Sequence, residues 1–288
     1  MDIDVLARLS AGLGKGLGRR HQKSFSQGAS HFKEINEKEN SLQSKAIFII
    51  VLNLSGIYRH QQFYTQRDQW IDLENVPGTT GYCDDQAAAI IRKRIKDCSA
   101  EALHFIDNGN YHYLSYFWLE KLKEPVDLLV FDHHSDMLRP VFGELMSCGS
   151  WLLRTVQELP KVQRVMIFGI DPDYVSHVPK SLRDRVATAD TDEGFHAFLR
   201  EHPGGSLYIS LDKDVFSTRD VRTNWDQGTL RYAHFERLLK TADNTRNIVG
   251  MDVCGESTEY GEQWHADGFN KKLVALIRST RFYQKICA

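Results

Sequence analysis

The chain has 288 residues and a hydrophobic content of 42%, enough for one large α/β domain or two small ones. Its 36 lysine and arginine residues nearly balance 38 aspartate and glutamate residues and form no dense basic cluster, so nucleic acid is not expected as a partner. The 5 cysteines form no Cys-x-x-Cys pair, which favours reduced thiols and a cytoplasmic protein. The longest apolar run, residues 46–52, is far shorter than the roughly 20 residues that span a bilayer, and no secretory signal opens the chain, so no membrane association is expected.

Two regions are predicted, a polar extension over residues 1–45 and one domain over residues 46–288. Gly-rich and charged patches dominate the extension, and its apolar content is too low for a core of its own. We therefore expect the extension to be mobile.

In the second region, predicted strands alternate with predicted helices. Apolar runs predict strands over residues 46–52, 102–106, 127–131, 164–169, 206–211 and 247–253. Helical spacing of apolar residues predicts helices over residues 85–97, 113–122, 150–158, 194–200, 234–241 and 269–278, with a helical segment near Ser181. Asp84 or Asp85 is expected to cap the first helix, after a polar connection over residues 53–81. This alternation predicts an α/β fold, a three-layer sandwich with a central, mainly parallel sheet and helices on both faces.

The third predicted strand runs directly into ionisable side chains. Alternate residues of a strand point to the same face, so Asp132, His134 and Asp136 share one side if the extended conformation persists. His133 then faces the other side, where a hydrogen-bonding role is expected. Two carboxylates and an imidazole that converge in this way form half of a metal site.

The fifth predicted strand repeats this pattern, with Asp212 and Asp214 on one face and Lys213 turned away. In parallel sheets, sites form outside the carboxyl ends of the strands. The other predicted strands lead into acids or histidines at that same end: His112, Asp171, Asp173 and Glu256. One shared site is therefore expected.

Six side chains are predicted to bind metal: His112, Asp132, His134, Asp136, Asp212 and Asp214. Hard oxygen donors with some imidazole suit Mn²⁺ better than a thiolate-rich zinc site would. Because 4 carboxylates balance two divalent ions, two Mn²⁺ per chain are expected, and another divalent metal is compatible with the ligands. Two ions about 3.5 to 4 Å apart lower the pKa of a bridging water, so hydrolysis is the expected chemistry.

The motifs resemble those of the arginase, or ureohydrolase, superfamily of dinuclear manganese hydrolases. The family's Asp-Ala-His-x-Asp appears as Asp132-His-His-Ser-Asp136, and its Ser-x-Asp-x-Asp appears as Ser210-Leu-Asp-Lys-Asp214. The resemblance runs from about residue 46 to the last helix and implies an arginase-like fold. It also implies that one ion is held by His112, Asp132, Asp136 and Asp212, and the other by His134, Asp132, Asp212 and Asp214. Asp132 and Asp212 would bridge the ions, and Asp136 would orient the hydroxide.

The sequence departs from the family at two positions that matter for catalysis. Cys148 stands where the family has a proton-shuttling histidine. The family's guanidinium-binding glutamate falls on Gly255, and Glu256 follows one residue later, where strand alternation turns it to the other face unless the loop bulges. Related enzymes contact substrate ammonium groups near the positions of Asp171 and Asp173, which are therefore the candidate substrate-binding residues. The candidate catalytic residues are Asp136, Cys148 and Glu256.

The resemblance implies a metal-dependent hydrolase that cleaves a carbon–nitrogen bond other than a peptide bond, in a small cationic guanidino compound. One alternative is an amide hydrolase, acting on an acylated amine at the same metal centre. Another is a protein that binds a ligand through the metal site without catalysis. The expected partner is a small-molecule substrate, and a homo-oligomer is compatible with the sequence.

Overall fold

The computed structural model describes residues 48–140, 143–259 and 261–287, and an eight-stranded parallel sheet lies at its centre. The predicted extension over residues 1–45 lies outside the described residues, so its mobility stays a prediction. No helix in the described part is both long and apolar enough to cross a membrane.

The sheet has the order β2-β1-β4-β10-β9-β5-β7-β8, and every strand pair is parallel. Its strands are β1 (Ile49–Asn53), β2 (Gln69–Asp72), β4 (Leu103–Phe105), β5 (Val126–Phe131), β7 (Val162–Phe168), β8 (Val186–Ala189), β9 (Ser206–Asp212) and β10 (Asn247–Cys254). The predicted α/β class and mainly parallel sheet are confirmed. The two edge strands, β2 and β8, were not predicted because each has a single buried residue, Ile71 and Val186, and so lacks an apolar run.

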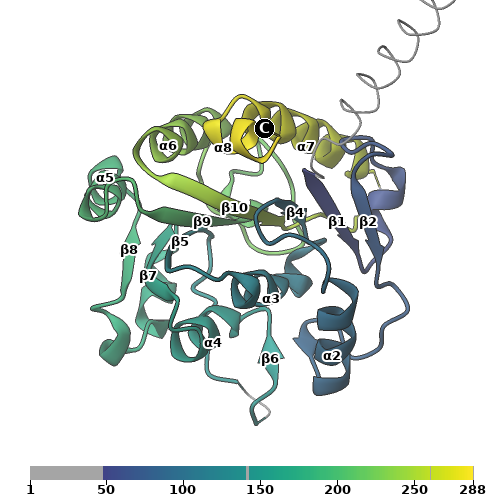
Figure 1. Cartoon of the computed structure of the whole chain (residues 1–288), viewed down its shortest axis with the longest axis horizontal. Coiled ribbons are helices and arrows are strands. Elements are labelled where there is room, and N and C mark those ends of the chain that lie inside the picture. Colours follow the sequence, from purple (N-terminus) through teal and green to yellow (C-terminus); the bar gives the residue numbers. More distant parts are fainter. Residues whose placement is uncertain (1–47, 141–142, 260, 288) are drawn as a thin grey trace, which may run out of the picture. The chain divides into compact units, whose positions relative to one another are not determined.

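Helices cover both faces of this sheet and complete the three predicted layers (Figure 1). On one face lie α2 (Asp85–Arg94), α3 (Leu114–Lys121) and α4 (Trp151–Glu158). On the other lie α5 (Asp192–Glu201), α6 (Tyr232–Thr245), α7 (Gln263–Arg278) and α8 (Arg281–Ile286). The Asp84 carboxylate caps α2 by accepting a 2.7 Å hydrogen bond from the amide of Ala87, as predicted, but the helix ends at Arg94 instead of Asp97. A two-stranded antiparallel sheet joins β3 (Tyr82–Cys83) to β6 (Met146–Ser147).

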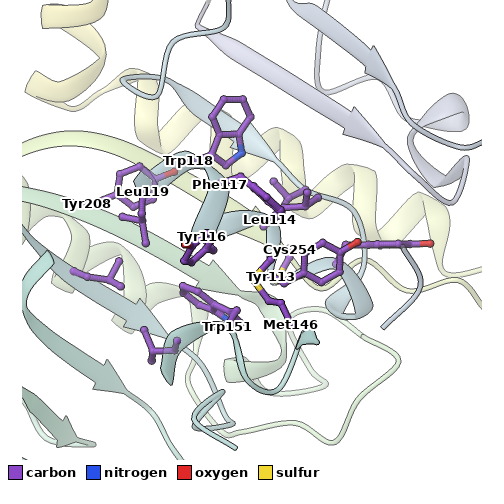
Figure 2. Packing of buried hydrophobic residues seen from close by; sticks show 14 of the residues in the cluster. Tyr113, Leu114, Tyr116, Phe117, Trp118, Leu119, Met146, Trp151, Tyr208 and Cys254 are labelled. Carbon is purple, nitrogen blue, oxygen red and sulfur yellow. The ribbon is translucent and has the colours of Figure 1, made fainter. Parts of the chain in front are cut away.

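Aromatic packing under α3 anchors the segment that carries His112. The side chains of Tyr113, Phe117 and Trp118 are fully buried against the sheet (Figure 2). Trp118 stacks on the buried His104 ring, with the ring centroids 3.8 Å apart. Because α3 is held by this core, His112, which lies two residues before the helix, is held close to the sheet.

The strand register places two predicted ligands side by side. Strands β5 and β9 are neighbours, and Phe131 pairs with Leu211. Asp132 and Asp212 follow these two residues directly, so both emerge at the carboxyl edge in the middle of the sheet. The same register on the other side of β9 pairs Cys254 with Asp212.

Candidate metal centre

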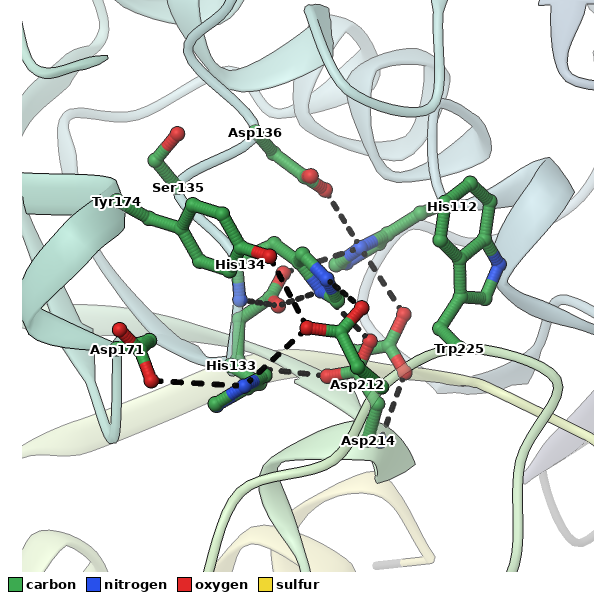
Figure 3. A network of polar contacts seen from close by, with 12 residues as sticks. His112, His133, His134, Ser135, Asp136, Asp171, Tyr174, Asp212, Asp214 and Trp225 are labelled. Atoms are coloured by element: carbon green, nitrogen blue, oxygen red, sulfur yellow. Dashed lines mark hydrogen bonds and ion pairs between the residues drawn. The ribbon is translucent and has the colours of Figure 1, made fainter.

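The structure gathers all six predicted ligands into overlapping groups of buried or half-buried side chains (Figure 3). One group contains His112, Asp132 and Asp136, a second contains Asp132, His134 and Asp214, and a third contains His112, Asp212 and Cys254. Asp132 belongs to the first two groups. In the third group, Asp212 Oδ2 lies 3.4 Å from His112 Nδ1. The ligand atoms within each group are close enough to share one ion, and the first two groups have a carboxylate in common.

The hydrogen bonds of His112 leave one ring nitrogen available for a metal. Its Nε2 lies 2.9 Å from Ser210 Oγ, which itself donates to a carboxylate oxygen of Asp252 at 2.7 Å. Ser210 therefore accepts from His112, and Nε2 carries the proton. His112 Nδ1 faces only carboxylates, with Asp136 Oδ2 at 2.9 Å, and carboxylates do not donate. Nδ1 must therefore bind either an added proton or a cation. A hydrogen-bond partner on the other ring nitrogen, here Ser210, commonly orients metal-binding histidines.

His134 repeats this arrangement on the other side of Asp132. Its Nε2 lies 3.0 Å from Asp226 Oδ1, and its Nδ1 lies 2.9 Å from Asp214 Oδ2. Tyr174 holds Asp226 in turn, since its hydroxyl donates to the other carboxylate oxygen at 3.0 Å. With Nε2 donating outward, His134 also presents Nδ1 to the cluster.

The electrostatics of the cluster indicate a deficit of positive charge. Burial raises the pKa of Asp132 well above its usual range, and the charges of Asp136 and Asp214 raise it further. Burial and the neighbouring Asp212 raise the pKa of Asp214 to about 7. Burial alone would lower the pKa of His112, but its hydrogen bond to Asp136 and the other carboxylates outweigh burial and raise it to about 10. Asp132 Oδ2 is buried and accepts no hydrogen bond. These groups fit divalent cations, which would replace the protons that the cluster otherwise binds.

Asp136 reaches the cluster by a different route from the predicted one. Strand β5 ends at Phe131, and Asp136 has a left-handed backbone with φ of 49°. The indole of Trp151 donates a 2.6 Å hydrogen bond to Asp136 Oδ2, and the start of α4 binds the Asp136 carbonyl through the amide of Leu152. Packing against α4, and not strand alternation, therefore orients this carboxylate. Trp151 was missed because nothing in its sequence context distinguishes it from a core residue.

Cys148 lines the pocket over the cluster, where the sequence predicts a catalytic role for it. Burial raises the pKa of its thiol to about 12, and the charge of Asp136 contributes. The thiol is therefore protonated at neutral pH and can donate a proton but not accept one. A second thiol, Cys254, donates to Asp212 Oδ2 at 2.9 Å and orients that carboxylate.

The structure does not bring Glu256 to the pocket. Its carboxylate forms a fully buried ion pair with Lys213 and accepts hydrogen bonds from Gln61 Nε2 at 3.0 Å and Asn270 Nδ2 at 2.7 Å. This is the direction that strand alternation predicts, and Lys213 is turned away from the cluster as expected. Gly255, with φ of 88°, makes the turn, and a Cβ atom there would overlap the Asp212 carboxylate.

Asp171 and Asp173 also lie outside the pocket lining. Asp171 accepts a 2.9 Å hydrogen bond from the amide of Asp173 and caps a short 3-10 helix over Pro172–His177. The predicted substrate acids thus form a turn. His133 is turned away from the pocket, as predicted, and its Nε2 lies 3.5 Å from Asp226.

The pocket above the cluster has a volume of about 420 Å³. Its walls include residues that no sequence pattern indicated, among them Tyr174 and Trp225. The ring of Tyr174 stacks on His134 at a centroid distance of 5.1 Å, and that of Trp225 meets His134 edge-on at 5.8 Å. Two aromatic side chains therefore flank this histidine (Figure 3).

Comparisons with known proteins identify the family to which the chain belongs. The arginase family model matches residues 45–267. An uncharacterized protein of Thermotoga maritima is 27% identical over 240 residues, which cover 83% of this chain and 91% of that protein. Among solved structures, proclavaminate amidino hydrolase from Streptomyces clavuligerus has a TM-score of 0.57 at 18% identity, covering 81% of this chain and 92% of that one. Formimidoylglutamase from Bacillus subtilis has a TM-score of 0.58 at 14% identity, covering 81% and 87%. The family match spans most of the chain and agrees with the observed sheet, and the chain belongs to the arginase family.

Proposed function

We propose that this protein is a dinuclear manganese hydrolase that cleaves a carbon–nitrogen bond in a guanidino compound. The observation that carries the proposal is the pair of carboxylate–imidazole groups that share Asp132. In both histidines Nε2 lies within hydrogen-bond distance of a residue outside the ligand set, Ser210 or Asp226, and Nδ1 faces the carboxylates. Membership of the arginase family supports hydrolysis of the ureohydrolase type.

The predicted ligands divide between two ions. His112, Asp132, Asp136 and Asp212 would hold one ion, and His134, Asp132, Asp212 and Asp214 would hold the other. When bound, the two ions would supply hydroxide at neutral pH by lowering the pKa of a coordinated water.

The protein's own groups then position and protonate the substrate. Asp136, which accepts a hydrogen bond from Trp151, would orient the attacking oxygen through a hydrogen bond. Cys148 lines the same pocket with a protonated thiol and would donate a proton to the leaving nitrogen. The aromatic rings of Tyr174 and Trp225 narrow the space beside His134 and limit the access of bulk water.

A second candidate function is hydrolysis of an amide, such as an acylated amine, at the same centre. The position of Glu256 favours it, because that acid is buried against Lys213 and cannot accept a guanidinium in the pocket. An amide is neutral and does not need a carboxylate to recognise it.

The first experiment measures bound metal by mass spectrometry after manganese loading. About two ions per chain are expected in the wild type, and few in a variant with Asp132→Asn and Asp212→Asn. A folded wild type that binds no manganese would refute the proposed manganese hydrolase.

A second experiment assigns the bond that is cleaved. The loaded protein is incubated with a panel of guanidino compounds, assayed for urea, and with acetylated amines, assayed for free amine. Urea release supports the guanidino class, and amine release alone supports the amidase. In the same assay Cys148→His should keep or raise turnover if the thiol acts only as a proton donor. A folded, metal-binding variant without turnover would show that imidazole cannot replace the thiol.

A further inference from the structure

The mouth of the pocket is apolar and exposed, although the metal groups at its base are charged. Of the five large hydrophobic side chains that are exposed in the described residues, three line this pocket: Tyr82, Leu138 and Trp225, with 39%, 47% and 41% exposure. They come from β3, from the loop after β5 and from the loop after β9. Exposed apolar residues that converge on one opening from separate segments indicate a binding surface.

Trp225 is fixed at the mouth by its surroundings. Its indole packs on Gly109, where a Cβ atom would lie 2.7 Å from Cδ1 and Nε1 of the indole. The loop is also held by Gln227, which donates to the carbonyls of Phe216 and Val221, each at 3.0 Å. The aromatic wall therefore exists before a ligand binds, which limits the entropy lost on binding.

The lining offers no carboxylate outside the predicted ligand set for a second cation. The carboxylates that line the pocket are Asp132, Asp136, Asp212 and Asp214, and all of them belong to that set. The other permanently charged residue of the described lining is Arg139. An ammonium group at the mouth would thus meet an arginine together with apolar and aromatic side chains, and no acid of the lining outside the ligand set.

We propose that the pocket mouth binds an apolar body, aliphatic or aromatic, attached to the reacting carbon–nitrogen group, and discriminates against a substrate with an ammonium tail. This inference rests on the proposed function, since it names the substrate class of the same site. A pocket of about 420 Å³ has room for such a body beyond the small group at its base. Continuity of the apolar mouth with the metal groups favours a small molecule that spans both.

The test uses hydroxamates, whose head group chelates divalent ions, so that the head stays constant while the tail varies. The probes are acetohydroxamate, octanohydroxamate, 8-aminooctanohydroxamate and the monohydroxamate of suberic acid. Their affinities for the manganese-loaded protein are measured by titration calorimetry. We expect octanohydroxamate to bind about sixtyfold more tightly than acetohydroxamate, since it has about six more methylenes and roughly a twofold gain per methylene is about half of full burial. The aminooctyl probe should bind at least about tenfold more weakly than the octyl probe.

Variants separate the mouth from the base of the pocket. Leu138→Ala should reduce the octyl advantage by about fivefold and leave acetohydroxamate unchanged. Trp264→Ala is the matched control, because Trp264 is 81% exposed and lies outside the pocket lining; it should change neither affinity.

Four results would overturn the proposal alone. Acetohydroxamate binding without dependence on tail length would remove the apolar subsite, and tightest binding of the aminooctyl probe would reverse its charge preference. An oligomer that dissociates in Leu138→Asp, seen by sedimentation, would assign the mouth to a second copy and overturn the proposal as well. Failure of every hydroxamate to bind the manganese-loaded protein would overturn this inference alone, whereas absence of bound manganese by mass spectrometry would refute the proposed metal centre and this inference together.

Discussion

Replacement of Glu256 by glutamine separates a structural role of this acid from the substrate-binding role that the sequence suggested. The carboxylate and the Lys213 ammonium are both fully buried and paired with each other. In Glu256→Gln the ammonium would stay buried without a counter-charge. The new amide group would also face the donors of Gln61 and Asn270, where the carboxylate accepts hydrogen bonds.

The expected loss is large compared with the stability of a typical domain. Breaking one side of a buried ion pair costs about 3–5 kcal/mol. For a domain of this size, each kcal/mol lowers Tm by about 2–4 °C, so a decrease of roughly 6–20 °C is expected. The assay is urea unfolding of the metal-free protein in EDTA, followed by circular dichroism, with thermal unfolding as a second measurement. Because EDTA removes bound metal, a difference in metal affinity between the wild type and Glu256→Gln cannot change their measured stabilities.

Matched variants make the comparison specific. Glu259→Gln alters an exposed acid in the same loop and should change stability by no more than about 0.5 kcal/mol. Lys213→Met combined with Glu256→Gln should recover about 2 kcal/mol relative to the sum of the single changes, because the unpaired charge is removed. If Glu256→Gln costs less than about 1 kcal/mol and instead weakens substrate binding, the structural explanation is refuted.

Three further predictions concern the metal groups and the core. Gly255→Ala should lose most manganese binding but remain folded, because the new Cβ would displace Asp212; normal metal content by mass spectrometry would contradict this. Asp226→Asn should weaken manganese binding about tenfold, since it removes the charge that accepts from His134 Nε2; calorimetry showing equal affinity would refute the role. Burial lowers the pKa of His104 to about 3, so this residue stays neutral in the folded protein while its unfolded form gains a proton below about pH 6.5. The free energy of unfolding of the metal-free protein should therefore decrease from pH 6.5 toward pH 3, and His104 should contribute up to about 1.4 kcal/mol per pH unit to this decrease. His104→Gln should lack this contribution; equal pH slopes for the two proteins in urea unfolding would contradict the prediction.

The central strands and their ligands were predictable because two local signals coincide there. In β5 and β9 an apolar run ends in acids, so one pattern gives both the strand and the position of Asp132 and Asp212 at its end, whereas Asp214 follows in a short 3-10 helix over Lys213–Val215. The edge strands β2 and β8 lack that signal, since most of their residues are half-buried or exposed.

Other parts of the site depend on contacts between segments distant in sequence. Asp226 is 92 residues from His134, and Trp151 reaches Asp136 only after the chain has turned into α4. Trp151 lies on the apolar face of a predicted helix and Asp226 lies in a loop, so sequence spacing does not indicate either contact. Strand alternation did indicate that Glu256 turns away, but the buried lysine that receives it became visible only in the folded chain.

Trp225 and Asp226 are consecutive residues with separate tasks. The indole of Trp225 forms part of the pocket mouth, and the carboxylate of Asp226 holds the ring of His134. Replacing this loop in order to change Trp225 would also displace Asp226. Substrate preference and metal retention are thus genetically linked in this chain, and engineering a new specificity will require selecting for both properties at once.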